Sequence, residues 1–263
     1  MSKINRLLTK AILASATLAL GSGAAFAACN DISRNDLENA ANAVVDANSS
    51  GGFNLPMWVT VVDETGKVCH VVNTARDTNS GPNIGNDSWL GSRVISAQKA
   101  STANAFSLNG FAISTANLYG LTQPDGSLYG LQHSNPIDAG TAYNGSPNTW
   151  GKNSDPLKNK RIGGVNVFGG GLALYNAGGV KVGAIGVSGD TSCTDHAVAW
   201  KIRTALGLDH VPAGFHSSLG GIGDELHIES GGANTGTAND TQQPTCPNPP
   251  APGAANGVIA DDD

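Results

Sequence analysis

The sequence from Arg161 to Leu206, RIGGVNVFGGGLALYNAGGVKVGAIGVSGDTSCTDHAVAWKIRTAL, decides the fold. It contains two short apolar runs, at residues 172–175 and 180–187, and a gap rich in Asn and Gly at 176–179. Because Asn and Gly tolerate the positive φ angles of a tight turn, this pattern predicts a β-hairpin. The Thr-Ser pair after the second run can cap a helix that continues to the end of the stretch. The stretch therefore predicts two adjacent strands followed directly by a helix.

The upstream sequence predicts a further hairpin between helices. Residues 31–47 and 92–107 carry apolar side chains at helical spacing, and the β-branched runs 57–62 and 67–72 are joined by the turn sequence DETG. Residues 122–160 are dominated by Gly, Pro, Asn and Ser, which predicts a long loop. The resulting order of elements does not alternate as βαβ units would. It favours an α+β fold with an antiparallel sheet.

Three ordered blocks of the sequence resemble the family variously called GlcG, HbpS-like or haem-degrading-domain proteins. They are VTVVDETGKV at residues 59–68, a helical block around Lys99, and GAIGVSG at residues 183–189 followed by Asp195. The resemblance covers roughly residues 31–208. It implies a single α+β domain with an antiparallel sheet of about five strands, flanked by helices in a profilin-like arrangement. It also implies an oligomer and, as in several members of the family, haem binding.

The N-terminus has the pattern of a secretory signal peptide. Three basic residues flank the start of an apolar run at about residues 11–20, and small residues end at Ala27, where we expect cleavage. The sequence thus predicts a signal peptide at 1–27, the α+β domain at 28–210, and a Gly/Pro/Asn-rich, partly disordered extension at 211–263. The expected location is the periplasm or the medium outside the cell.

The charge of the mature chain is acidic. Cleavage would remove three basic and no acidic residues, so the formal net charge of −6 would become −9. Nucleic acid and anionic membrane surfaces would be repelled by such a field, and we expect neither as a partner.

All four cysteines survive the expected cleavage. In an oxidising compartment an even number favours two disulfides, and three connectivities are possible. The sequence does not choose among them. We prefer Cys29 with Cys69 and Cys193 with Cys246, because the second pair would anchor the Pro/Gly-rich tail to the start of the last helix.

A haem site would need an apolar slot, cations for the propionates and, in many haem proteins, an axial ligand. Three histidines inside the domain are candidate ligands. His70 lies on a predicted strand, and His133 lies in a Gly-containing loop that could present it. His196 lies near the start of the last helix, where the dipole favours the neutral, metal-binding imidazole. The candidate partners for the propionates are Arg93, Lys99 and Arg161.

The sequence favours binding over turnover. Ser96 and Lys99 match the S-x-x-K spacing of serine β-lactamases, but the companion motifs are missing. We therefore assign no catalytic residue, and the primary hypothesis is an exported protein that binds haem or a similar planar anionic molecule. The alternatives are an enzyme that degrades haem and releases iron, and an accessory protein that passes ligand state to a membrane sensor or receptor. A homo-oligomer is the expected assembly.

Overall fold

A computed structural model describes residues 28–75, 84–214, 223–229 and 242–261. The predicted signal peptide, residues 1–27, lies outside the described residues. Among those described, no helix is both long and apolar enough to cross a membrane.

The fold is built on an antiparallel sheet of four strands in the order β2-β1-β4-β3. The first predicted hairpin is β1 (Trp58–Asp63) with β2 (Val68–Asn73), and the second is β3 (Gly171–Tyr175) with β4 (Lys181–Ser188). The two hairpins join through β1 and β4, which also run antiparallel. The predicted α+β class is confirmed, although this sheet has four strands where about five were expected.

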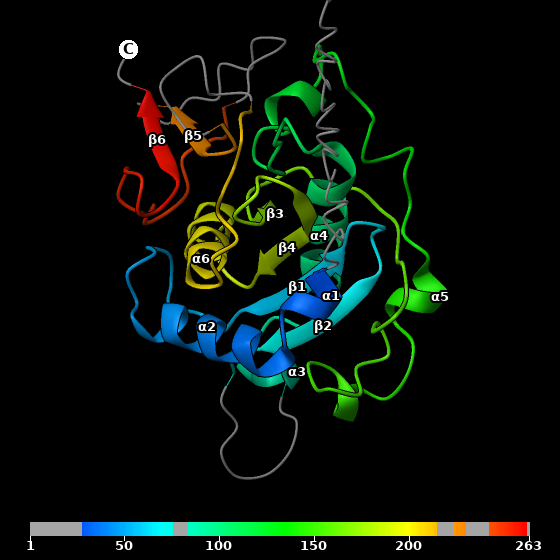
Figure 1. Cartoon of the computed structure of the whole chain (residues 1–263). Coiled ribbons are helices and arrows are strands. Elements are labelled where there is room, and N and C mark those ends of the chain that lie inside the picture. Colours follow the sequence, from blue (N-terminus) through cyan, green and yellow to red (C-terminus); the bar gives the residue numbers. More distant parts are fainter. Residues whose placement is uncertain (1–27, 76–83, 215–222, 230–241, 262–263) are drawn as a thin grey trace, which may run out of the picture.

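Helices cover both faces of the sheet (Figure 1). Helix α4 (Ser92–Phe106) packs on one face, against β1, β3 and β4. Helices α2 (Arg34–Asp46) and α6 (Ser192–Ala205) pack on the other face and against each other, next to the short α1 (Ala28–Asp31). The sheet is thus covered on both sides, which explains why β1 and β3 are buried at every position instead of at alternate ones.

Small residues bring α4 unusually close to the sheet. Ala97, Ala100 and Ala103 of α4 are fully buried in the core on this face. Opposite them, a Cβ atom added to Gly186 of β4 would lie 2.0 Å from the carbonyl oxygen of Ser96. No side chain can be accommodated at that distance, so the glycine sets the spacing between helix and strand.

The second half of the long predicted loop packs against α4. The loop follows η1 (Gly120–Thr122) and contains α5 (Ala139–Ala142) and η2 (Pro147–Thr149), and α3 (Ile84–Asp87) precedes α4. Trp150 and Leu157 of this loop are buried in the same core as the alanines of α4. The loop therefore forms an outer layer over that helix.

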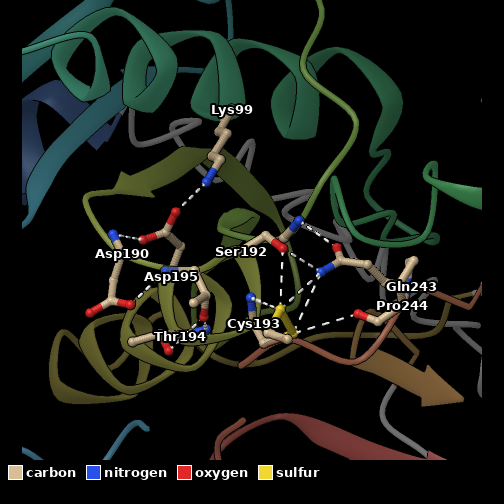
Figure 2. Close-up of a disulfide and its surroundings, with 11 residues drawn as sticks. Lys99, Asp190, Ser192, Cys193, Thr194, Asp195, Gln243 and Pro244 are labelled. Carbon is tan, nitrogen blue, oxygen red and sulfur yellow. Dashed lines mark hydrogen bonds and ion pairs between the residues drawn. A yellow bond between two sulfur atoms is a disulfide. The ribbon is translucent and has the colours of Figure 1, made fainter. Parts of the chain in front are cut away.

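Two disulfides are formed, Cys29–Cys69 and Cys193–Cys246, and the preferred pairing is confirmed. The second disulfide ties the tail to the start of α6, as the sequence led us to expect (Figure 2). The described parts of the tail form a separate two-stranded parallel sheet from β5 (Leu226–Glu229) and β6 (Val258–Asp261). Leu226, Ile228 and Val258 are buried against Cys193. These parts pack on the domain, whereas the sequence favoured a poorly packed extension.

Candidate functional site

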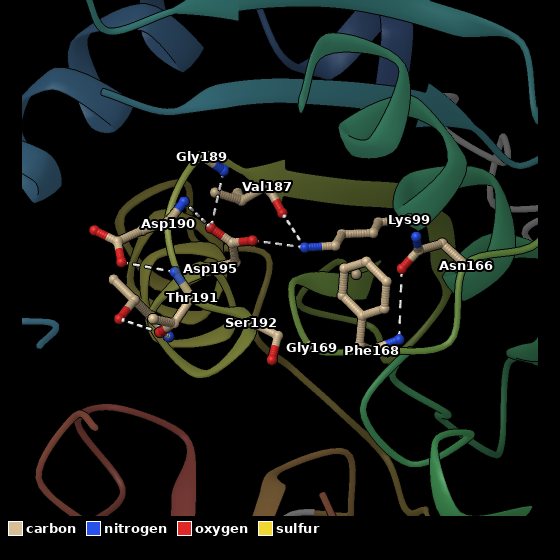
Figure 3. A network of polar contacts seen from close by, with 12 residues as sticks. Lys99, Asn166, Phe168, Gly169, Val187, Gly189, Asp190, Thr191, Ser192 and Asp195 are labelled. Atoms are coloured by element: carbon tan, nitrogen blue, oxygen red, sulfur yellow. Dashed lines mark hydrogen bonds and ion pairs between the residues drawn. The ribbon is translucent and has the colours of Figure 1, made fainter. Parts of the chain in front are cut away.

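Two of the three sequence blocks, the one around Lys99 and the one that runs from residue 183 to Asp195, meet at a buried ion pair beneath the end of β4 (Figure 3). The Lys99 side chain is completely buried, and its Nζ donates to Asp195 Oδ2 at 2.7 Å and to the carbonyl oxygen of Val187 at 2.9 Å. The same ammonium lies over the ring of Phe168, 4.8 Å from the centroid. Lys99 therefore joins α4 to both β4 and α6.

The Asp195 carboxylate is held by the chain that turns from β4 into α6. Its Oδ1 accepts the N–H groups of Gly189 at 3.0 Å and Asp190 at 2.9 Å. The turn is fixed because Thr191 caps α6, accepting the N–H of Thr194. Burial raises the pKa of Asp195 to about 6 and lowers the pKa of Lys99, so the pair depends on these hydrogen bonds to remain charged.

The glycine run that precedes β3 serves packing within the chain. A Cβ atom at any of the three positions would lie 2.5 Å from a carbonyl oxygen: that of Ser192 for Gly169, Val187 for Gly170 and Lys99 for Gly171. The run therefore lets the backbone pass between α4, β4 and α6, and it does not form a phosphate-binding loop.

The tail covers this junction from outside. Gln243 is buried; its Oε1 accepts the Gly169 N–H at 2.8 Å, and its Nε2 donates to Ser192 Oγ at 2.6 Å (Figure 2). The junction is consequently closed to solvent on that side. With its charges paired and covered, it is built to hold elements together, and a ligand has no open route to Lys99.

A second buried ion pair holds the long loop. Arg93 of α4 forms a two-pronged contact with Asp155, donates to the carbonyl oxygen of Ala142 at 2.9 Å, and stacks on Trp150 with 4.4 Å to the ring centroid. Sequence reasoning missed Asp155, because a single Asp in an Asn/Ser-rich loop carries no periodic signal. Arg93 and Lys99 were expected to be open to propionates, but both are engaged by internal carboxylates.

The three shortlisted histidines lie in different environments. His196 is fully buried and stacks on Trp200, with ring centroids 6.2 Å apart. His70 is half-buried, its Nε2 lies 2.9 Å from the Ile32 carbonyl oxygen, and burial lowers its pKa. His133 is exposed. Lys99 and His196 lie in one region, because Lys99 pairs with Asp195, the neighbour of His196 in the sequence. The other candidate site residues lie elsewhere.

His133 lies on a compact, solvent-facing loop formed by residues 126–134, which we call the His133 loop. Successive turns shape it: the His133 N–H donates to the Gly130 carbonyl at 3.0 Å, and the Tyr129 N–H donates to the Gly126 carbonyl at 3.1 Å. Tyr129 is 65% exposed and Leu128 36% exposed. The loop thus presents an imidazole close in sequence to apolar surface.

A cleft of about 410 Å³ lies between α2 and the end of α6. Its floor is apolar, with Ile32 and Leu208 buried, but Asp31 and Asp36 stand at its rim. Two carboxylates would repel the propionates of haem. No group of three or more His, Cys, Asp or Glu side chains among the described residues is arranged to hold a metal ion.

Comparison with known proteins gives one family and four chains of solved structures, among them ORFY and PduOC. The model of the family described as haem degrading protein HbpS-like matches residues 32–203. No curated protein matches the chain. The Klebsiella pneumoniae protein ORFY is 20% identical with a TM-score of 0.43, and the match covers 66% of this chain and 90% of ORFY. The PduOC:heme complex is 24% identical with a TM-score of 0.42, and the match covers 66% of this chain and 94% of PduOC.

Proposed function

The chain belongs to the HbpS-like family of haem-degrading proteins, and from this premise we propose that it is an exported haem-binding protein. The family match, which spans most of the domain, is the observation that carries the proposal. Export is supported by the predicted signal peptide and by the two disulfides, since disulfides persist in oxidising compartments.

We place the haem on the His133 loop. An axial ligand must reach the iron, and the rings of His70 and His196 are respectively bonded to a carbonyl group and buried in the core. His133 is exposed, and Leu128 and Tyr129 offer apolar surface to a porphyrin face. Haem bound there would supply iron-centred redox chemistry.

Arg161 is the shortlisted cation best placed to meet a propionate. Ile137 pairs with Gly163, and the Asp138 N–H donates to the Ile162 carbonyl at 2.7 Å, so the segment carrying Arg161 runs beside the residues that follow the His133 loop. The Arg161 side chain is exposed and bonded only to Thr65 among the described residues. Arg93 and Lys99 would first have to leave Asp155 and Asp195, at a cost of several kcal/mol per buried charge.

Titration of the mature protein with haemin tests the proposal. We expect a saturable shift of the Soret band with a fixed stoichiometry. His133→Ala should weaken binding about tenfold or more, because one coordination bond is lost. The matched control is His210→Ala, another exposed histidine, which should leave binding unchanged. No Soret shift would reject haem binding, whereas equal binding by His133→Ala would reject only the placement.

The family description favours a second candidate, degradation of haem with release of iron. Iron liberated under peroxide is measured with a chelating dye, against haem bound to albumin as the control for bleaching. Release that exceeds the control and declines in His133→Ala supports the enzyme. Release equal to the control supports a binding protein.

We also propose a homo-oligomer in which a second copy covers the His133 loop. In one chain the loop leaves Tyr129 largely exposed, and a planar ligand there would have protein on one face only. Light scattering of the haem-loaded protein should give a multiple of the chain mass. A monomer mass with full haem occupancy would contradict this assembly.

A further inference from the structure

The Cys193–Cys246 disulfide is surrounded mainly by hydrogen-bond donors. The Cys193 N–H donates to Cys246 Sγ at 3.2 Å, and Gln243 Nε2 lies 3.7 Å from Cys193 Sγ and 3.9 Å from Cys246 Sγ (Figure 2). Ser192 Oγ lies 3.5 Å from Cys246 Sγ, and an opposing oxygen, the Pro244 carbonyl, lies 3.9 Å from Cys193 Sγ. Cys193 also lies in the first turn of α6, where the helix dipole stabilises negative charge. These surroundings favour a thiolate.

The Cys29–Cys69 disulfide has the opposite surroundings. Cys29 Sγ lies 3.8 Å from Asp63 Oδ2, and Cys69 Sγ lies 3.8 Å from the carbonyl oxygen of Lys67. Cys69 lies within strand β2, so no helix dipole acts along it. Asp63 Oδ2 also pairs with Lys67 Nζ at 3.3 Å, which weakens the effect of the carboxylate, but the carboxylate and the carbonyl oxygen both still raise the energy of a neighbouring thiolate. This disulfide is therefore a poor source of a leaving thiolate.

Access to the two disulfides is nearly matched. Each joins one buried residue, Cys193 at 0% or Cys69 at 2% exposure, to one partly exposed residue, Cys246 or Cys29. In each case an attacking thiolate reaches the partly exposed sulfur and expels the buried one. Any large difference in reactivity should then come from the charge around the sulfurs, and Cys29–Cys69 serves as an internal control.

We propose that Cys193–Cys246 is a thiol–disulfide exchange site, which dithiols reduce in preference to Cys29–Cys69. One thiolate of the dithiol attacks Cys246 Sγ, forms a mixed disulfide and expels the Cys193 thiolate, which takes up a proton. The second thiolate of the dithiol then attacks the dithiol's first sulfur, breaks the mixed disulfide and expels the Cys246 thiolate, which is protonated in turn. Two electrons pass from the dithiol to the protein, and the dithiol leaves as a cyclic disulfide.

Reduction would change how the tail is held. In the oxidised protein, Gln243 forms hydrogen bonds to Gly169 and Ser192, and it lies three residues before Cys246. The disulfide and these hydrogen bonds therefore hold the same short segment of the tail. After reduction only non-covalent contacts hold residues 242–261 on α6. The exchange site therefore controls how firmly the tail covers the junction at Gly169.

The test is a reduction time course on the full mature protein at neutral pH. Dithiothreitol is the probe, samples are quenched with an alkylating agent, and peptide mass spectrometry measures labelling at each cysteine. We expect Cys193 and Cys246 to be labelled about tenfold faster than Cys29 and Cys69, because a more stable thiolate leaves faster. Amide exchange in residues 242–261 should rise with the same rate.

Two variants move the rates in opposite ways. Gln243→Glu places a carboxylate beside Cys193–Cys246 and should slow its reduction several-fold without affecting the other bond. Asp63→Asn removes the carboxylate beside Cys29 and should speed reduction of Cys29–Cys69. Equal rates for the two bonds in the unaltered protein, or faster labelling of Cys29 and Cys69, would overturn the proposal. So would a rate that does not depend on dithiothreitol concentration, because unfolding would then be limiting.

Discussion

Replacing Lys99 by Met tests the buried ion pair at the centre of the fold. Met keeps most of the side-chain volume but removes the ammonium that bonds Asp195 and the Val187 carbonyl. Asp195 would keep two backbone N–H donors and lose its counter-ion in a site with 1% exposure. Breaking one side of a buried pair costs about 3–5 kcal/mol, a large share of the stability of a domain of this size.

The assay is equilibrium urea denaturation of the oxidised protein at neutral pH, followed by far-UV circular dichroism. The control is Lys158→Met, because Lys158 Nζ donates an exposed hydrogen bond to Asn153 Oδ1 and forms no buried ion pair among the described residues, and it should change the free energy of unfolding by less than about 0.5 kcal/mol. Adding Asp195→Asn to Lys99→Met should restore part of the loss, since the amide oxygen can still accept the N–H groups of the turn. A loss below about 1 kcal/mol for Lys99→Met would refute the claim that this pair is a structural centre.

Three further predictions concern other parts of the fold. Burial holds the pKa of His70 in the folded protein below its ordinary value, so the unfolded chain binds a proton at higher pH than the folded protein does. The free energy of unfolding should therefore fall as the pH drops below about 6.5, by up to 1.4 kcal/mol per pH unit. His70→Gln should remove this slope in denaturation measured across that range. Replacing both Cys193 and Cys246 by Ala should lower the free energy of unfolding by about 4 kcal/mol, from loop entropy over a sequence separation of 53; an unchanged urea midpoint would contradict this. Gly186→Ala should cost about 1–3 kcal/mol or more, because its Cβ would overlap the Ser96 carbonyl, and an unchanged thermal midpoint would show that α4 can shift.

Local patterns were sufficient to predict the frame of the protein. The turn residues at 176–179, the capping Thr191 and the β-branched runs each have a physical meaning within a few residues, and the structure contains the corresponding hairpins and helix. The disulfide Cys193–Cys246 was preferred because a loose tail beside a helix start needs an anchor. All these features depend on short-range chemistry that a single sequence displays.

The buried charges could not be predicted in the same way. Arg93 and Lys99 lie on a helix whose spacing is amphipathic, where a cation normally marks the solvent face. Their partners, Asp155 and Asp195, lie 62 and 96 residues further along the chain. No periodicity connects residues so far apart. The sequence could not show which of the three histidines is exposed for the same reason, because their exposure depends on which residues the long loop and the tail cover.

The two ion pairs of α4 determine how much of the chain must be present before the domain can fold. Arg93 and Lys99 enter the chain well before their carboxylate partners, and the tail bond to Cys246 closes later still. Until those distant segments are present, burying the two cations of the helix without their carboxylate partners would cost free energy, so an incomplete chain does not close its core. The final shape of the domain is therefore reached only when nearly the whole length of the chain is available to fold.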